Sequence, residues 1–257
     1  MDKAKLERLF DVSGRVAIVT GGTRGIGRAI AEGLVSGGAN VVVGSRKADA
    51  CRETEEHLQT LGGGRAVAIP VHMGDLEAGP ALVDRAVSEF GGVDIVVNNA
   101  ANALTQPLGA FTPEAWQKSY DVNLRGPVFL IQAALPHLER SEHAAIVNVI
   151  SAGAFLFSAN VAMYGAAKAA LMSFTRSMAA DFAPRGIRVN ALAPGTVDTD
   201  MVRANTPEAQ RSMANASFMR RAASADEMVG PVIYLASDAS SFMTGQVLLV
   251  DGGLVPH

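Results

Sequence analysis

A chain of 257 residues has room for one large α/β domain or two small ones, and it can bury enough surface to fold without disulfides. Its net charge of -3 argues against nucleic acid or an anionic membrane surface as a partner. Cys51 is the single cysteine, which excludes an internal disulfide and a multi-cysteine metal site. Residues 1–14 are charged and the longest apolar runs are far too short to span a membrane, so we expect no signal peptide and a cytoplasmic protein.

Short β-branched runs alternate with longer helical stretches from end to end. Several of the runs are almost continuously apolar, which is typical of parallel strands covered on both faces. The strands are predicted at 15–20, 40–44, 65–71, 93–98, 144–150, 187–193 and 246–250, with helical stretches that include 27–38, 80–92 and 171–186. Because no linker or repeat interrupts this alternation, we predict one α/β domain over residues 1–257, a doubly wound, seven-stranded parallel sheet with helices on both faces.

A glycine cluster, TGGTRGIG at residues 20–27, stands between the first predicted strand and the first long helix. Gly21 can form a tight turn, Gly25 lets the backbone approach a pyrophosphate, and Gly27 lets the helix pack closely on the sheet. The helix N-terminus adds free N–H groups for the phosphates. Glycines also simply turn chains, and the spacing is Gly-x-x-x-Gly-x-Gly instead of the commoner Gly-x-Gly-x-x-Gly. The position between strand and helix favours a dinucleotide site.

The end of the second predicted strand indicates which dinucleotide binds. NAD-binding domains carry a carboxylate there for the ribose hydroxyls, whereas this chain has Ser45 and Arg46. Arg46 can form a forked pair with a 2′-phosphate, and Arg24 in the glycine loop can assist. Although both arginines could be ordinary solvated side chains, two cations and no carboxylate favour NADP over NAD.

The segment YGAAK, residues 164–168, places a phenol and an ammonium four residues apart. On a helix these positions lie on one face, so Tyr164 and Lys168 are neighbours. The pair is either an ordinary helix surface or a device in which the cation makes the phenol release its proton more easily.

From residue 14 to residue 253 the chain resembles the classical short-chain dehydrogenases/reductases. The resemblance rests on TGGTRGIG, on NNAA at 98–101, on DVNLRG at 121–126, on Ser151, on YGAAK and on PGTVDT at 194–199. It implies a Rossmann-type fold and a catalytic set of Asn123, Ser151, Tyr164 and Lys168. In that family the tyrosine is the general acid/base at the substrate oxygen, and the serine hydrogen-bonds this oxygen. The lysine lowers the pKa of the tyrosine and holds the nicotinamide ribose, while the asparagine interrupts a helix and holds a proton-relaying water.

The resemblance also implies further contacts with the cofactor. Val197 and Thr199 would contact the nicotinamide carboxamide. The complete cofactor set would be Gly21, Thr23, Arg24, Gly25, Ile26, Gly27, Ser45, Arg46, His72, Met73, Asn99, Ala100, Ala101, Tyr164, Lys168, Pro194, Gly195, Val197 and Thr199. Ala101, Ile150 and His72 depart from the family's usual residues, which affects local cofactor contacts and not the reaction.

The substrate side is expected to be apolar. Ser151, Phe155 and Tyr164 are the predicted substrate contacts, within a wall formed by residues 152–163. Residues 200–222 contain several methionines and form either a lid or plain helix packing. An apolar ketone, or the corresponding secondary alcohol, is therefore the first choice of small-molecule substrate. Reduction of a 3-oxoacyl thioester is the alternative, although Ala180 stands where carrier-dependent reductases tend to have arginine.

A protein of a different class, a non-catalytic NADP(H) sensor or scaffold, is a further alternative. Such proteins usually lose the tyrosine or the lysine, and this chain keeps both. The resemblance also implies a homotetramer, or at least a dimer, with the helical region 113–138 and the helix after Tyr164 packed against their copies. The four histidines other than His72 are scattered and form neither a metal triad nor a Ser-His-Asp set.

Overall fold

The structure is a computed structural model and describes residues 1–157 and 160–255. Within these residues seven strands form one parallel sheet in the order β3-β2-β1-β4-β5-β6-β7. The strands are β1 (Val16–Thr20), β2 (Asn40–Ser45), β3 (Ala66–Pro70), β4 (Ile95–Asn98), β5 (Ala145–Val149), β6 (Arg188–Pro194) and β7 (Val247–Val250). The doubly wound parallel sheet is confirmed, and each predicted strand is present with ends shifted by at most two residues.

The helices follow the strands along the chain. The α-helices are α1 (Lys3–Leu9), α2 (Gly25–Ser36), α3 (Ala48–Thr60), α4 (Ala78–Phe90), α5 (Pro113–Tyr120), α6 (Gly126–Leu138), α7 (Ala162–Phe182), α8 (Asp200–Arg203), α9 (Pro207–Asn215) and α10 (Val229–Ala236). A π-helix, η1 (Asp121–Arg125), joins α5 to α6, and short 3₁₀ turns are η2 (Ala152–Ala154), η3 (Ala183–Arg185), η4 (Ala225–Met228) and η5 (Asp238–Ser240). Helix α7 begins well before the predicted stretch, so it carries both Tyr164 and Lys168.

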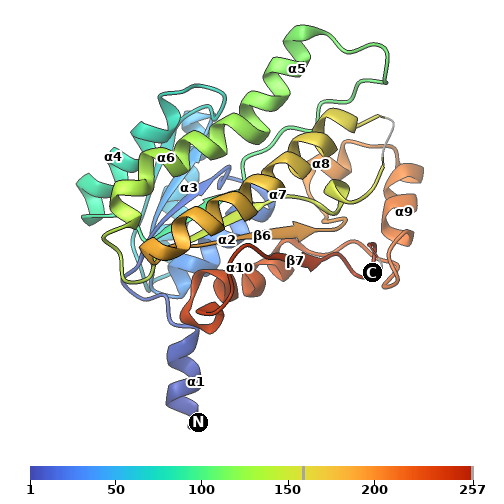
Figure 1. The fold of residues 1–257 in the computed structure, drawn as a ribbon. Coiled ribbons are helices and arrows are strands. Elements are labelled where there is room, and N and C mark those ends of the chain that lie inside the picture. Colours follow the sequence, from blue (N-terminus) through green and yellow to red (C-terminus); the bar gives the residue numbers. More distant parts are fainter. Residues whose placement is uncertain (158–159, 256–257) are drawn as a thin grey trace.

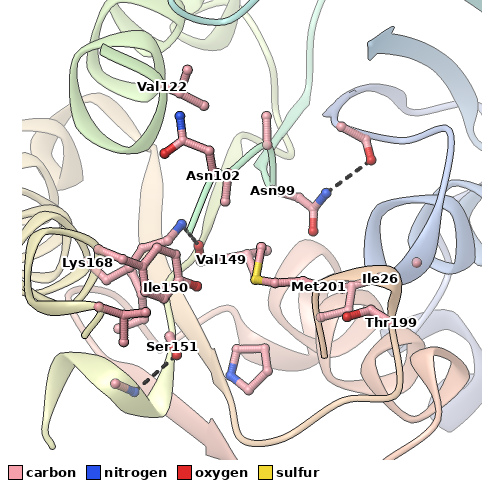
Figure 2. A pocket seen from close by; sticks show the side chains of 18 of the residues that line it. Ile26, Asn99, Asn102, Val122, Val149, Ile150, Ser151, Lys168, Thr199 and Met201 are labelled. Carbon is pink, nitrogen blue, oxygen red and sulfur yellow. Dashed lines mark hydrogen bonds between the residues drawn. The ribbon is translucent and has the colours of Figure 1, made fainter. Parts of the chain in front are cut away.

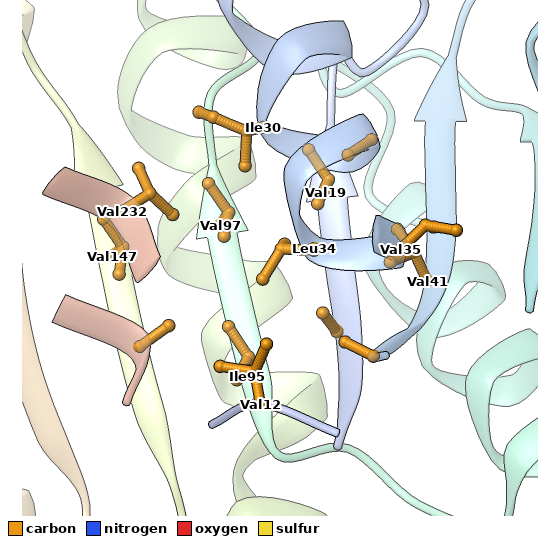
Figure 3. Packing of buried hydrophobic residues seen from close by; sticks show 14 of the residues in the cluster. Val12, Val19, Ile30, Leu34, Val35, Val41, Ile95, Val97, Val147 and Val232 are labelled. Carbon is orange, nitrogen blue, oxygen red and sulfur yellow. The ribbon is translucent and has the colours of Figure 1, made fainter. Parts of the chain in front are cut away.

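Two layers of helices cover the sheet (Figure 1). On one face, α2, α3 and α10 pack against alternate strand residues such as Val19 and Val97 (Figure 3). On the other face, α4, α6 and α7 pack against the intervening residues, including Ile18 and Val96. Because successive side chains of a strand point to opposite faces, burial on both faces explains why these strands are continuously apolar.

The strand order reverses beside β1, which pairs with β2 on one side and with β4 on the other. The carboxyl ends of the parallel strands meet at one edge, and ligands of such sheets bind outside the reversal point. The Thr20 hydroxyl holds this point together by accepting hydrogen bonds from the backbone N–H groups of Asn99 and Ala100, both at 3.0 Å. The ends of β1 and β4 are thereby fixed side by side.

A buried polar chain connects the central strands to α7. The Asn98 amide donates to Asn148 Oδ1 at 2.9 Å, and the Asn148 amide donates to Thr175 Oγ1 at 2.9 Å. Buried polar groups are costly unless they are hydrogen-bonded, so this chain favours one placement of α7 against β4 and β5. Asn98 therefore stabilises the central strands. No helix in the described part of the chain is long and apolar enough to cross a lipid bilayer.

Candidate active site

A cavity of about 1080 Å³ lies at the carboxyl edge of the sheet. The glycine loop, the end of β2 and the end of β4 line one part of it. The other part is lined by residues of α7, by the loop before α7, and by α8 and α9. Figure 2 shows Ile26 and Thr199 on one side of this cavity and Ser151 and Lys168 on the other. The cavity therefore joins the predicted phosphate site to the predicted chemical site.

The glycine loop has the geometry of a phosphate cradle. Gly21 has φ 67°, a left-handed conformation that favours glycine. A Cβ at Gly27 would lie 2.4 Å from the Gly21 carbonyl oxygen and 2.3 Å from Asn99 Nδ2, so only glycine fits there. No side chain caps the N-terminus of α2 at Arg24, which leaves N–H groups of the first turn available to an anion. This loop fits the pyrophosphate of a dinucleotide.

The end of β2 has cationic and hydroxyl groups suited to a 2′-phosphate. The hydroxyls of Thr23 and Ser45 are 2.7 Å apart. Arg46 makes no ion pair or hydrogen bond within the described residues, whereas Arg24 Nη1 lies 3.3 Å from Asp200 Oδ2. Both members of the Arg24–Asp200 pair are mainly exposed, and such pairs contribute little to stability. The Arg46 guanidinium is thus free to bind an anion, and the Arg24 guanidinium can be released from its weak ion pair with Asp200.

The chemical end combines the end of β5 with the first turns of α7. Ser151 follows β5, and its Oγ accepts a hydrogen bond from the Gly153 N–H at 3.0 Å. Lys168 is fully buried, and its Nζ donates to the Val149 carbonyl oxygen at 2.7 Å (Figure 2). The same ammonium lies 5.7 Å from the centre of the Tyr164 ring. Tyr164, Lys168 and Ser151 all line the cavity.

Burial controls the ionisation of Tyr164 and Lys168. It raises the pKa of Tyr164, and a hydrogen bond from Ser151 opposes this shift by favouring the phenolate. Burial also lowers the pKa of Lys168 to about 8. Among the protein's own groups, desolvation is thus the largest influence on the pKa of Tyr164, and the lowering of this pKa by Lys168 together with the nicotinamide charge stays a prediction. The desolvation of the phenol dominates, and the ammonium is bonded to a backbone carbonyl rather than to the phenol oxygen.

Asn123 lies in the π-helix, so the predicted interruption of the helix is present. Its side chain is fully buried and does not line the cavity. Asn123 Nδ2 donates to the Asn102 carbonyl at 2.8 Å, and Asn123 Oδ1 accepts from the Asn102 N–H at 3.0 Å. Asn102 does line the cavity. The side chain of Asn123 thus fixes Asn102 from behind the wall and does not itself reach the site.

Comparison with known proteins identifies the family. The model of the family described as "Enoyl-(Acyl carrier protein) reductase" matches residues 21–255. The chain is 39% identical to cis-4-hydroxycyclohexanecarboxylate dehydrogenase of Sinomonas cyclohexanicum, over 93% of this chain and 96% of that protein. It is 37% identical to human dehydrogenase/reductase SDR family member 4, over 98% of this chain and 92% of the relative.

A solved structure also matches this chain along nearly its whole length. The 3-oxoacyl (acyl-carrier-protein) reductase of Agrobacterium tumefaciens C58, solved with NADP bound, superposes with a TM-score of 0.90 at 37% identity and covers 96% of this chain and 97% of its own. The chain belongs to the short-chain dehydrogenase/reductase family. It is therefore an oxidoreductase of alcohol and carbonyl groups, and the solved relative supports a nicotinamide cofactor.

The fold brings almost all the residues predicted from the resemblance to this family into one cavity. The predicted cofactor contacts line it without exception, together with Ser151. Phe155 does not: it packs against a small core cluster with Ile150 and Leu171, and its role as a substrate contact stays a prediction. Its neighbours Leu156 and Phe157 line the cavity instead. Residues 158 and 159 of the predicted substrate wall lie outside the described residues.

Several groups at the site escaped the sequence analysis, among them Asn102, Leu104, Leu108, the Val149 carbonyl and Leu254. Asn102 directly follows the NNAA motif, so its position in the sequence could have indicated that it lies at the site. The Val149 carbonyl, which binds Lys168, and Leu254, which lines the cavity from the C-terminal segment, have no local signature. No cluster of histidine, cysteine, aspartate and glutamate side chains that could hold a metal ion occurs among residues 1–157 and 160–255.

Proposed function

We propose that this protein is an NADP-dependent reductase of apolar ketones, which it converts reversibly to secondary alcohols. The observation that carries the proposal is that one cavity holds all the predicted cofactor contacts together with Ser151, with cationic groups at one part and apolar side chains at the other. Arg24 and Arg46 lie at one part of it, with no carboxylate at the end of β2. At the other part, Tyr164 and Ser151 share a wall with apolar side chains.

The residues at the first part fit NADP(H) and leave no acidic partner for the ribose hydroxyls of NAD. Gly21, Gly25 and Gly27 form the cradle for the pyrophosphate, and Ser45 and Arg46 provide donors for the 2′-phosphate. When bound, NADPH supplies the hydride that reduces the carbonyl carbon. Lys168 and Thr199 also line this cavity, and they would hold the nicotinamide and its ribose.

The protein's own groups supply the proton and stabilise the charge. Its raised pKa keeps Tyr164 protonated at neutral pH, which is the form that a proton donor to the developing alkoxide requires. The Ser151 hydroxyl donates a hydrogen bond to the same oxygen and stabilises its negative charge. Because the pKa of Lys168 is about 8, this amine can exchange protons near neutral pH and restore the proton of Tyr164.

The substrate wall favours an apolar group. Its side chains come from four separate segments and are mostly aliphatic or thioether groups: Leu104, Leu108, Leu156, Met201, Met213 and Leu254. A polyhydroxylated sugar would leave its hydroxyls without partners against this wall, and unpaired buried polar groups are costly. An aliphatic or alicyclic ketone meets no such cost.

A 3-oxoacyl thioester is the second candidate substrate. The likeness to the 3-oxoacyl reductase of Agrobacterium tumefaciens and the apolar wall favour it. Ala180, which stands before Asp181 on the catalytic helix, provides no cation for an acyl carrier. A free ketone therefore remains our first choice.

The test is a panel of substrates mixed with the protein and NADPH, with the loss of NADPH absorbance as the readout. We expect turnover of apolar ketones, slower turnover of a 3-oxoacyl thioester and negligible turnover of sugars. Binding of NADPH without turnover of any substrate would contradict the proposal and favour a non-catalytic NADP(H) sensor.

A further inference from the structure

The chain folds back over the cavity after its last strand. Strand β7 ends at Val250, and residues 251–255 return toward α9 (Figure 1). Leu254 of this segment lines the same cavity as Tyr164, although 90 residues separate them in sequence. The C-terminal segment therefore contributes to the wall that faces the substrate.

One carboxylate fixes the shape of this segment. Asp251 Oδ1 accepts the Gly253 N–H at 2.9 Å, and Oδ2 accepts the Val255 N–H at 2.8 Å. Its backbone carbonyl also accepts the Leu254 N–H at 3.2 Å. Gly252 and Gly253 adopt φ values of 64° and 80°, which only glycine adopts easily. Asp251 thus holds both residues that flank Leu254, and its side chain takes no part in the proposed chemistry.

The turn is also attached to the chain that follows α9. The Met219 N–H donates to the Gly252 carbonyl at 3.0 Å. A Cβ at Gly253 would lie 2.6 Å from the ring of Phe218, so this segment packs closely on the turn. Helix α9 contributes Met213 to the cavity. Leu254 and Met213 therefore belong to one wall.

These two side chains differ in how they respond to a large substrate. Met213 is flexible and lies on a helix with no buried residue among those described, so it can move aside. Leu254 sits on a turn whose backbone is fixed from both sides, and its branched side chain has few rotamers. The stiff part of the wall is thus Leu254.

From this arrangement we infer that Leu254, positioned by Asp251, limits the length of the apolar group that the site accepts beside the reacting carbonyl. The inference rests on the proposed ketone reduction and names the residue that sets its substrate range. In an apolar pocket, one extra or missing methylene typically changes the discrimination between two substrates about 10- to 200-fold.

The experiment compares straight-chain methyl ketones of increasing length as substrates of the wild-type protein and of Leu254→Ala. The variant is expected to raise kcat/KM for the longest ketones at least about 10-fold and to leave the shortest nearly unchanged. Val255→Ala is the matched control, because Val255 is the next residue and does not line the cavity in the described structure. Its length profile should match that of the wild type.

Asp251→Asn tests the positioning role, because one carboxylate oxygen is replaced by an N–H donor that faces a backbone N–H. The preference should again shift to longer ketones, through KM, while kcat for the shortest ketone and the Kd of NADPH stay unchanged. Leu254→Phe should shift the preference to shorter ketones. This variant keeps the test decisive if the truncated variant does not fold.

The outcomes distinguish the inference from the function on which it rests. A wild-type protein that reduces these ketones, with Leu254→Ala showing the wild-type length profile, would overturn the inference alone. An equal shift in Val255→Ala would also overturn it, because the effect would then be general loosening of the segment. A wild-type protein that reduces no ketone would overturn the proposed function and the inference together.

Discussion

Lys168 Nζ donates a hydrogen bond of 2.7 Å to the carbonyl oxygen of Val149, and this bond joins α7 to the end of β5. The acceptor is a backbone group, so it fixes the position of the ammonium without neutralising its charge. Among the described residues no carboxylate pairs with Lys168, so it is a buried cation whose charged form the folded protein disfavours.

The stability of the protein should consequently depend on the titration of Lys168. Its pKa falls from 10.5 to about 8 on folding, so between these pH values the unfolded state binds more protons than the folded state. The free energy of unfolding therefore rises with pH in this window and is lowest, as far as this group is concerned, below pH 8. The shift corresponds to about 3 kcal/mol.

Urea unfolding of the wild-type protein and of Lys168→Met, measured from pH 7 to pH 10.5, checks this sign. The difference in unfolding free energy should move by up to about 3 kcal/mol in favour of the wild type as the pH rises. A constant difference over the whole window would show that Lys168 titrates normally in the folded protein.

Tyr164→Phe should abolish most turnover while leaving the fold and NADPH binding intact. The ring and its packing remain, but the proton donor is lost, and general acid catalysis typically contributes about 10²–10⁴-fold. The measurements are kcat with an apolar ketone and the Kd of NADPH from its fluorescence. Near-normal kcat would remove Tyr164 from the proposed mechanism.

Arg46→Ala should weaken NADPH binding by about 10- to 100-fold and leave NADH binding nearly unchanged, because only NADPH carries the 2′-phosphate. Arg52→Ala is the matched control, since Arg52 lies on α3, the helix that follows Arg46, pairs with Asp49 and does not line the cavity in the described residues. Fluorescence titrations with both cofactors at low salt measure the effect. A wild-type protein that binds NADH more tightly would contradict the assignment.

The double variant Ser45→Asp/Arg46→Ala should go further and prefer NADH. The new carboxylate would repel the 2′-phosphate and accept the ribose hydroxyls of NAD. The ratio of kcat/KM values for the two cofactors measures the switch, and a ratio that still favours NADPH would show that other groups determine the choice.

The protein is predicted to form a homotetramer, or at least a dimer, through the helical region 113–138, which comprises α5, η1 and α6, and through α7. Phe129 on α6 and Phe174 on α7 are each 43% exposed, so both offer apolar surface to a second copy of the chain. Phe174→Glu should therefore shift the sedimentation coefficient toward a smaller species. Leu61→Glu, at the end of α3 on the other face of the sheet, should not. A monomeric wild-type protein at micromolar concentration would contradict the prediction.

Features with a short sequence period could be predicted from the sequence. Burial on both faces makes each strand continuously apolar, and glycine at positions 21 and 27 is required by backbone geometry and close contact. The pairing of Tyr164 with Lys168 follows from the pitch of one helix. The interruption of the helix at Asn123 was predicted from the family resemblance, because the DVNLRG motif is matched there as a whole.

The tertiary structure alone decided which groups meet across the sequence and how strongly they are desolvated. It joined Lys168 to a carbonyl 19 residues away, paired Arg24 with Asp200, and placed Leu254 in the cavity in preference to Phe155. It also buried the Tyr164 phenol, which raises the pKa of this group. The physical reason is that propensity and periodicity depend on near neighbours, whereas burial and long-range contacts depend on the packing of all the elements together.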